Sequence, residues 1–69
     1  MGRSLLLGVE AEVRRRGGRL MLIETSGTTP YARARRLYET SGYRHEAVIH
    51  DFYAPGDDLH VYAKEMAVA

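Results

Sequence analysis

Residues 32–43 read ARARRLYETSGY, a stretch that predicts a helix ending at a glycine and leading into a strand. Thr28 or Thr29 can cap this helix, and Pro30 suits its first position because the ring fixes a helical φ. Gly42 is expected to end the helix, since glycine readily adopts the positive φ that follows a last helical turn. One side of the predicted helix carries Tyr31, Ala34, Leu37, Tyr38 and Ser41.

The sequence before this helix predicts a first helix and a short strand. Apolar residues recur at helical spacing through residues 2–16, and Gly17 and Gly18 are expected to stop that helix. Residues 20–23 are four consecutive apolar residues, which is typical of a strand buried on both faces in a parallel or mixed sheet. The predicted apolar stripe of the first helix is Leu5, Leu6, Val9 and Val13, and its polar remainder is Arg3, Glu10, Glu12, Arg14 and Arg15.

The sequence after this helix predicts two strands. Residues 43–53 form a long strand, 54–57 a turn, and 59–64 an alternating last strand, so the pair is expected to be an antiparallel hairpin. The order helix, strand, helix, strand, strand indicates an α+β (α/β-like) fold. A parallel neighbour for the strand at 20–23 would normally arrive through a strand–helix crossover. Because no strand precedes the first helix, we expect residues 1–69 to be a single partial domain.

Composition excludes several classes of protein. The chain has 69 residues, which allows one small domain. The absence of cysteine excludes disulfides and thiolate metal sites, and the three histidines, His45, His50 and His60, match no metal-binding spacing. A net charge of +1 argues against a nucleic-acid partner. No apolar run reaches the ~20 residues of a membrane span, so we expect a cytoplasmic protein without a membrane, nucleic-acid or metal partner.

Ala34, Tyr38, Gly42 and Tyr43 reproduce the spacing A-x3-Y-x3-G-[FY]. This spacing resembles the signature of the GNAT superfamily of N-acetyltransferases, in which the helix after the central strand ends in this way.

The order of other segments also resembles that superfamily. Residues 2–6 resemble the end of the acetyl-CoA loop and the start of its helix, and residues 17–23 the helix-to-strand turn. Residues 24–26 and 51–58 resemble one bacterial branch. The resemblance implies the C-terminal half of a GNAT domain, a partial GNAT fold with a mixed sheet and a C-terminal antiparallel hairpin.

The resemblance also implies roles for individual residues. The counterpart of Tyr38 donates a proton to the departing CoA thiolate, and a phenol can do so because it is protonated at neutral pH. Gly2, Arg3 and Ser4 would meet the pyrophosphate of acetyl-CoA, since a helix N-terminus attracts anions. From the residues alone, Tyr38 can equally be a core tyrosine, and Gly2 and Ser4 can simply begin a frayed helix.

The remaining expected site residues lie near the second helix. The resemblance implies that Tyr31, Ala34 and Tyr38 also bind the cofactor, and Tyr31 occupies the place, three residues before Ala34, where many family members carry an Asn that binds the pantetheine arm. Glu24 is the best candidate for a general base, because strand ends line ligand crevices, although it can also be a loop carboxylate. Some polar groups have two readings, as ligands of CoA phosphates or of a cationic amine, or as ordinary helix-surface and turn residues: Arg35, Arg36, Asp51, Tyr53, Asp57 and Asp58.

Two functions are consistent with these features. The first is an N-acetyltransferase that uses acetyl-CoA without a metal and acts on a primary amine of a small molecule or a peptide. It would need missing strands from an upstream region, a complementing N-terminal half or a second copy in a homodimer. The alternative is a non-catalytic truncated module that dimerises or binds a protein partner through an open strand edge.

Overall fold

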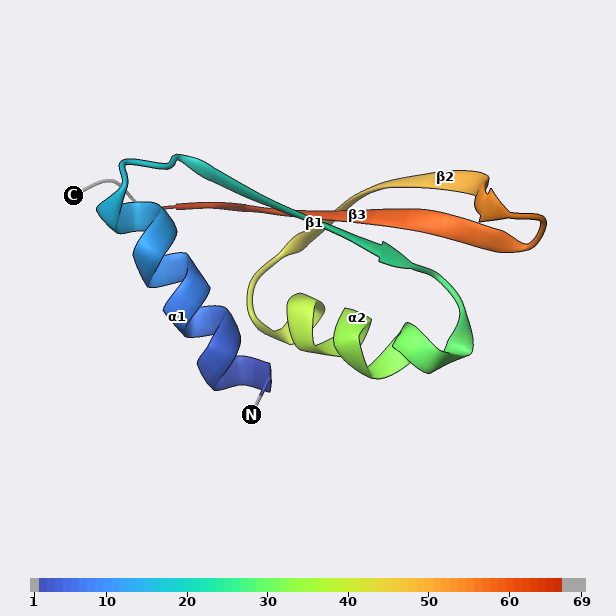
Figure 1. Ribbon diagram of the computed structural model, residues 1–69, viewed down its shortest axis with the longest axis horizontal. Coiled ribbons are helices and arrows are strands. Elements are labelled where there is room, and N and C mark those ends of the chain that lie inside the picture. The colour runs from blue at the N-terminus through green and yellow to red at the C-terminus, as the bar shows by residue number, and fades with distance from the viewer. Residues whose placement is uncertain (1, 67–69) are drawn as a thin grey trace.

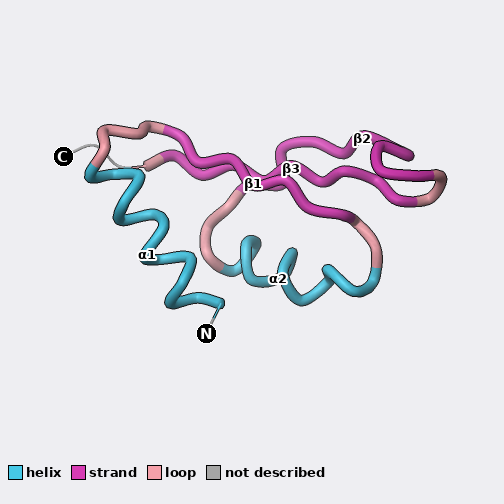
Figure 2. The backbone as a smooth tube through the Cα atoms, viewed as in Figure 1, coloured by secondary structure: helices cyan, strands magenta, loops and turns pink. Residues whose placement is uncertain are grey.

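The computed structural model describes residues 2–66. Two helices lie on one side of a three-stranded sheet (Figures 1 and 2), so the predicted α+β class and the predicted element order are confirmed. None of the helices in this part of the chain has the length and apolar character needed to cross a lipid bilayer. The elements are α1 (Gly2–Arg15), β1 (Leu20–Ser26), the 3-10 turn η1 (Thr29–Tyr31), α2 (Ala32–Thr40), β2 (Arg44–Ala54) and β3 (Asp57–Glu65).

The sheet has the order β1-β3-β2, and both pairings are antiparallel. The predicted hairpin of β2 and β3 is confirmed, but β3 also pairs along the whole of β1, from Leu20 opposite Glu65 to Ser26 opposite Leu59. Within residues 2–66 the sheet is therefore antiparallel rather than mixed. The expectation failed here because an apolar run indicates burial and does not indicate the direction of the partner strand.

Strand β1 lies at an edge of the described sheet, and only one of its faces is covered. Met21 and Ile23 are partly buried against the core, whereas Leu20 and Leu22 remain 50% and 58% exposed. The prediction that this strand is buried on both faces is therefore wrong for the described residues. Alternation along the strand explains the difference, because α1 and α2 cover the face of Met21 and Ile23 alone.

Both helices end at the predicted glycines. Gly17 has a φ of +80°, and the N–H of Gly18 donates to the Val13 carbonyl over 2.8 Å. Gly42 has a φ of +91°, and the N–H of the following residue, Tyr43, donates to the carbonyl of Tyr38 over 3.1 Å. These are Schellman-type ends, in which a residue without a Cβ accepts the left-handed conformation.

The predicted threonine cap of the second helix is wrong. Thr28 precedes η1 but makes no side-chain capping bond. Its hydroxyl instead lies 2.8 Å from the Ser26 hydroxyl, and its N–H donates to that same oxygen over 3.1 Å. The Thr28 hydroxyl is therefore used in a local turn with the Ser26 side chain and does not cap the helix.

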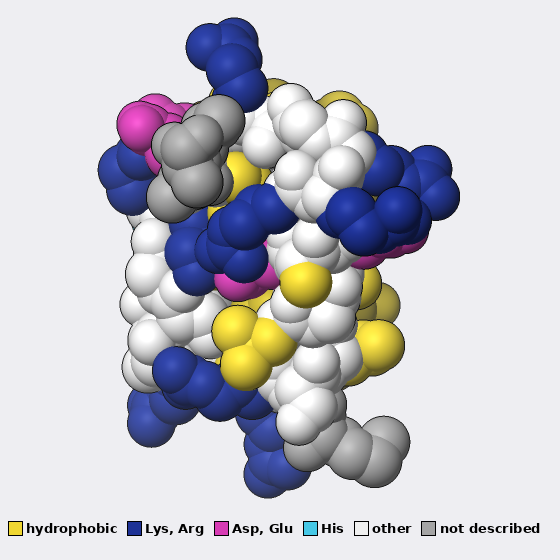
Figure 3. All heavy atoms as spheres, turned by 90° about the vertical axis from the view of Figure 1, so that its left-hand side faces the viewer, with side chains coloured by type: hydrophobic (Ala, Val, Ile, Leu, Met, Phe, Trp, Pro, Cys, Tyr) yellow, Lys and Arg dark blue, Asp and Glu magenta, His cyan; other side chains and the backbone are white. Residues whose placement is uncertain are grey.

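The core lies between α1 and the sheet, and it differs from the predicted apolar stripe. Leu6, Tyr43 and Tyr62 are buried together, but Leu5 and Val9 are 73% and 43% exposed. Hydrophobic side chains reach the surface among groups of basic side chains on the side of the molecule drawn in Figure 3. The stripe prediction was also wrong about Glu10, which was assigned to the polar side of the helix and is only 1% exposed.

Candidate functional site

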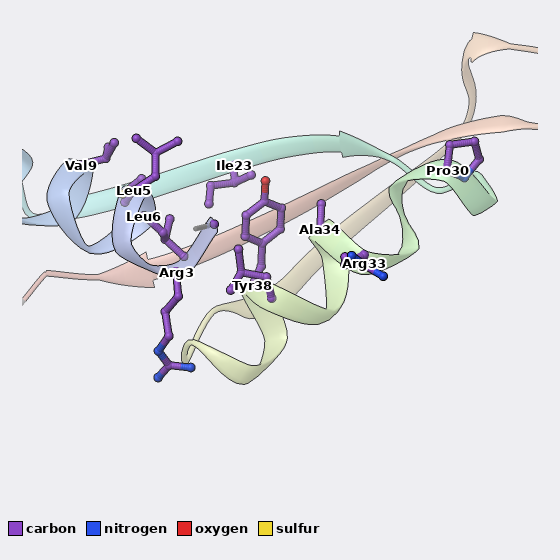
Figure 4. Close-up of a pocket in the computed structure, with 12 residues that line it drawn as sticks. Arg3, Leu5, Leu6, Val9, Ile23, Pro30, Arg33, Ala34 and Tyr38 are labelled. Atoms are coloured by element: carbon purple, nitrogen blue, oxygen red, sulfur yellow. The ribbon is translucent and has the colours of Figure 1, made fainter.

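An open cavity of about 720 Å³ lies between α1, β1 and α2 (Figure 4). Its walls are mainly apolar. Four of the residues predicted from the sequence for cofactor binding line it, namely Gly2, Arg3, Ala34 and Tyr38, whereas Ser4 does not. The full lining is Gly2, Arg3, Leu5, Leu6, Val9, Met21, Ile23, Pro30, Arg33, Ala34, Leu37 and Tyr38.

Tyr38 points its hydroxyl toward β1, between Ile23 and Ala34 (Figure 4). Its ring packs edge-on against the ring of Tyr43, with the ring centroids 6.0 Å apart. It also packs at a tilt against the ring of Tyr62, with the centroids 5.7 Å apart. The Tyr43 and Tyr62 hydroxyls donate to carboxylates, but the Tyr38 hydroxyl has no hydrogen-bond partner among residues 2–66. The phenol of Tyr38 is therefore held by its neighbours and is available to a ligand in the cavity.

The motif spacing explains this placement. In the Gly42 turn, the N–H of Tyr43 donates to the carbonyl of Tyr38 over 3.1 Å. The glycine thereby reverses the chain within one residue, so that the ring of Tyr43 enters the core directly beside Tyr38. Tyr38 lies near the end of α2, four residues before Gly42, whose φ is positive. This spacing keeps the rings of Tyr38 and Tyr43 in contact.

The start of α1 lies against α2. A Cβ built on Gly2 would lie 3.1 Å from Leu37 Cδ2, so the glycine allows the two helices to approach closely. Arg3 lines the cavity, but its guanidinium points away from Tyr38 (Figure 4). The first N–H groups of a helix have no partner within the helix, which makes this end of the cavity suitable for an anion.

Buried polar groups fix α1 to the sheet behind this cavity. The Tyr43 hydroxyl donates to Glu10 Oε2 over 2.7 Å, and Lys64 Nζ donates to both carboxylate oxygens over 3.2 and 3.3 Å. Burial raises the pKa of Glu10, but the bonds from Tyr43 and Lys64 and the charges of Lys64 and Arg14 bring it below its ordinary value. Burial, and then the Glu10 carboxylate, raise the pKa of Tyr43. Glu10 therefore stays ionised in the core and supports the ring that packs on Tyr38.

A second cavity of about 300 Å³ lies at the C-terminal end of β1, and Tyr31 lines it rather than the first cavity. The backbone of Tyr31, with φ −100° and ψ 4°, precedes the regular helix, so its side chain does not share a side of α2 with Ala34. The structure thus separates two residues that the sequence predicted to lie along one side of the helix. The second cavity is lined by Glu24, Thr25, Ser26, Tyr31, Tyr53 and Asp57.

Glu24 and Ile23 are neighbours on β1, yet Glu24 lines the second cavity and Ile23 the first. Met21 and Ile23 line the first cavity and Glu24, Thr25 and Ser26 all line the second, so the division follows the position along β1. The two catalytic residues expected from the sequence, Tyr38 and Glu24, therefore line different cavities, and that of Glu24 lies at the C-terminal end of β1.

The role of Arg35 could not be found by sequence reasoning. Its Nη1 donates to the carbonyls of Ser26 and Thr28, each over 2.8 Å. It therefore holds the loop between β1 and η1 and is neither a free surface charge nor directed at the first cavity. Arg33, which was not predicted as a site residue, lines that cavity instead.

The hairpin carboxylates mostly stabilise the turn. Asp51 has a φ of +56° and accepts the N–H of Gly56 over 2.7 Å, while Asp58 accepts the N–H of Asp51 over 2.9 Å. The bond from the Asp51 N–H, and then that from His50, lower the pKa of Asp58. Asp51 and Asp58 therefore act as turn-stabilising residues, which is the second of the two readings given above. Only Tyr53 and Asp57 of this group line the second cavity.

Solved structures of acetyltransferases are similar to this chain. A protein from Desulfovibrio desulfuricans, assigned to the GNAT acetyltransferase family, is 49% identical over 94% of this chain and 41% of its own, with a TM-score of 0.90. The acetyltransferase yncA from Salmonella typhimurium, whose structure contains acetyl-CoA, is 23% identical over 96% of this chain and 39% of its own, with a TM-score of 0.84.

A third similar structure is the ribosomal-protein-S18-alanine N-acetyltransferase from Escherichia coli, 24% identical over 97% of this chain and 44% of its own, with a TM-score of 0.82. The chain thus spans about two fifths of the length of these proteins. No protein-family model matches the sequence, and no curated protein matches it significantly.

Proposed function

Because this chain is part of a GNAT acetyltransferase domain, we propose that it supplies the acetyl-CoA site of an N-acetyltransferase, together with the group that protonates the departing thiolate. One observation carries the proposal: the Tyr38 hydroxyl points into an open cavity between α1, β1 and α2 (Figure 4) and is bound by no residue of the described chain. The structure of yncA with acetyl-CoA supports the choice of acyl donor.

The residues of the first cavity suit acetyl-CoA. Its apolar walls match the hydrocarbon parts of the pantetheine arm, and the unpaired edge of β1 offers backbone N–H and C=O groups to the arm's amides, as a sheet edge does to an added strand. The helix N-terminus at Gly2, with Arg3 and Arg33 nearby, suits the phosphates. Ala34 leaves room on α2 opposite the strand, beside the Tyr38 hydroxyl.

The reaction joins the amine nitrogen to the acetyl carbonyl carbon and breaks the carbon–sulfur bond. In this proposal Tyr38 gives its phenolic proton to the thiolate that leaves, which is general acid catalysis. Glu24, at the C-terminal end of β1, takes a proton from the protonated amine, directly or through water. The protonated amine loses two protons in forming the amide: Glu24 takes the first and later releases it to water, and the second restores the phenol of Tyr38 after Tyr38 has protonated the thiolate.

A complementing segment is part of the proposal, because the chain spans about two fifths of its solved relatives. We place its first contact at the open edge of β1, where a strand can pair with free backbone groups. An upstream region, a second polypeptide or a second copy of the chain could supply it. Residues 1–69 are, in this view, the C-terminal half of one acetyltransferase domain, and the acceptor is a primary amine.

A second candidate function is a non-catalytic module that dimerises or binds a protein partner. The exposure of Leu20 and Leu22 on the face of β1 opposite the helices favours it, because uncovered apolar side chains beside an open strand edge promote association.

A calorimetric titration of the 69-residue chain with acetyl-CoA, with the mass in solution measured in parallel, distinguishes the two functions. Ala34→Trp should fill the first cavity and abolish saturable binding. Ala32→Trp is the matched control, because Ala32 is on the same helix but does not line the cavity. A folded chain that binds no acetyl-CoA at millimolar concentration would refute the proposed donor site and favour the module.

A further inference from the structure

Strand β1 has a row of unpaired backbone groups along its open edge within residues 2–66. The Arg19 carbonyl accepts the N–H of Met66 over 2.8 Å, and the N–H of Gly27 donates to the Asp58 carbonyl over 2.9 Å. Both bonds continue the register of β1 with β3. Because bonded residues alternate along an antiparallel pair, the odd-numbered residues of β1 bond to β3. The residues whose N–H and C=O groups point to the open edge are then Leu20, Leu22, Glu24 and Ser26.

The side chains on both sides of this edge are apolar and uncovered. Leu20 and Leu22 lie on the face away from the helices, and each is at least half exposed. On the helix face, Leu5 and Val9 of α1 line the first cavity and are also exposed. A strand added at this edge would therefore bury apolar side chains on both of its faces. Residues 20–23 make β1 itself a strand of that kind, so a second copy of the chain can supply it.

The other edge of the sheet is less suited to pairing. The register of β2 with β3 is interrupted between His45 and Ala47 and between Ile49 and Ala54, and Asp51 has a positive φ of +56°. Bulges and bends of this kind protect an edge strand against a new partner. Strand β1 pairs with β3 without interruption, so its edge is the one that a second copy can extend.

We propose that β1 pairs with β1 of a second copy in the antiparallel direction, centred on Leu22, and joins two three-stranded sheets into one. The open backbone groups belong to even-numbered residues, so an even-numbered residue must lie opposite an even-numbered one. The register centred on Leu22 meets this condition and also places Met21 opposite Ile23 of the second copy. A register centred on Met21 overlaps only residues 20–22 of the two strands, and one centred on Ile23 places Leu22 against Glu24. The hydrophobic pattern therefore selects the register centred on Leu22.

The ends of β1 carry opposite charges, which favours the antiparallel direction. Arg19 precedes the strand and Glu24 lies near its C-terminal end, and neither forms an ion pair with residues 2–66. In the proposed register Arg19 lies opposite Thr25 of the second copy, one residue from Glu24. A parallel pair would instead place like ends together. The two-fold axis is perpendicular to the sheet, so both copies keep their helices on the same side.

This inference rests on the second candidate function and names its partner. The added strand would occupy the edge of β1 that the donor site needs for the pantetheine arm, and it would cover the apolar wall of the first cavity beside that edge. Self-association and the binding of acetyl-CoA should therefore exclude each other.

Sedimentation equilibrium of the unmodified 69-residue chain, combined with amide hydrogen exchange, tests the pairing. We expect a monomer–dimer equilibrium in which exchange at Leu20, Leu22 and Glu24 slows as the dimer forms. The amide of Ile23 bonds to β3 and should be protected in both states. A monomeric mass at all concentrations, or a dimer in which the Leu22 amide still exchanges freely, would overturn the inference.

A lysine at the centre of the pair should oppose it. Leu22→Lys should weaken the dimer about tenfold, because the two lysines would meet at the axis and an edge lysine disfavours strand pairing. Ile49→Lys is the matched control: Ile49 is similarly exposed but lies on β2, so the dissociation constant should equal that of the unmodified chain. Equal weakening by the two variants would overturn the inference, because exposed apolar surface in general would then drive association.

A single cysteine measures the register, since the chain contains no other cysteine. Opposite residues of a bonded antiparallel pair have Cα atoms about 5.5 Å apart, which is within reach of a disulfide. Leu22→Cys should therefore form a cross-linked dimer on oxidation. Leu20→Cys is the control, because its two Cα atoms would be about 13 Å apart. Equal cross-linking of the two variants would overturn the proposed register.

A titration with acetyl-CoA separates this inference from the proposed donor site. A dimer that binds no acetyl-CoA would support the pairing and remove the donor site. A monomer that binds acetyl-CoA would overturn the pairing and leave the donor site intact. A dimer that binds acetyl-CoA without dissociating would also overturn the pairing, because the edge of β1 would then be free.

Discussion

Replacing Tyr43 by Phe removes one hydroxyl group from a buried, ionised cluster. The hydroxyl donates to Glu10 Oε2 over 2.7 Å, and the carboxylate has only 1% of its surface exposed. Lys64 still donates to both oxygens of Glu10 in the variant, over 3.2 and 3.3 Å. The substitution therefore deletes one of three hydrogen bonds to a charged group without leaving that charge unpaired.

The cost follows from this geometry. A hydrogen bond to a charged group contributes about 1.5–3 kcal/mol, and the remaining bonds from Lys64 favour the lower part of that range, about 1.5–2 kcal/mol. A chain of 69 residues has a total free energy of unfolding of about 3–10 kcal/mol. Tyr43→Phe should therefore remove a large fraction of the stability while leaving the fold intact.

The effect should depend on pH in a defined direction. The pKa of Glu10 lies below its ordinary value of 4.5 in the folded chain, so its stabilisation is present above that pH and is lost as the pH falls through the folded pKa. Once Glu10 is protonated, the bond from Tyr43 no longer meets a charge. The difference in stability between Tyr43→Phe and the unmodified chain should thus be full at pH 7 and shrink in acid.

Urea unfolding followed by circular dichroism, at neutral and acidic pH, measures this difference. Tyr31→Phe is the matched control: it deletes the same hydroxyl from a half-exposed ring without a hydrogen bond in the described structure, and it should change the stability by less than about 0.5 kcal/mol. The reasoning is refuted if the two variants are equally stable at pH 7, or if the difference stays constant as Glu10 is protonated.

Three further predictions concern other parts of the chain. In a completed enzyme, Tyr38→Phe should lower kcat about 100-fold and leave the affinity for acetyl-CoA nearly unchanged; unaltered turnover in a steady-state assay would exclude Tyr38 as the proton donor. Burial, and then the charges of His45 and Arg35, lower the pKa of His60 below 6.5, so the stability contributed by neutral His60 is present above that pH and should decrease as the pH falls below it. His60→Gln should flatten this dependence in urea titrations at a series of pH values, and an identical slope would contradict it. A Cβ on Gly27 would lie 2.3 Å from His60 Nε2, so Gly27→Ala should cost about 1–3 kcal/mol, and combining it with His60→Ala should recover part of that loss in a double-mutant cycle. Strict additivity of the two substitutions would show that they do not clash.

Sequence reasoning was accurate where the cause is local. Gly17 and Gly42 end their helices because glycine accepts the φ values of +80° and +91° found there. The spacing of Tyr38, Gly42 and Tyr43 resembles the GNAT signature and in that way predicted the family, and the same short segment also places the two rings side by side. These features require only neighbouring residues, so the sequence contains them directly.

The candidate site was predicted only in part. Gly2, Arg3, Ala34 and Tyr38 were expected at one site and do line one cavity. Tyr31 was expected with them, but the irregular backbone before α2 directs it to the second cavity. A single change of backbone conformation at a helix start is enough to move a side chain to another surface, and helical spacing cannot reveal it.

The sequence by itself determined the elements, their order, the glycine ends of the helices and the hairpin, because each depends on periodicity or on the φ of one residue. The tertiary structure alone decided that β3 lies between β1 and β2. It also decided that Glu10 is buried, through partners 33 and 54 positions away. Strand pairing and the neutralisation of a buried charge join distant residues, and their free energy depends on the three-dimensional arrangement rather than on any local pattern.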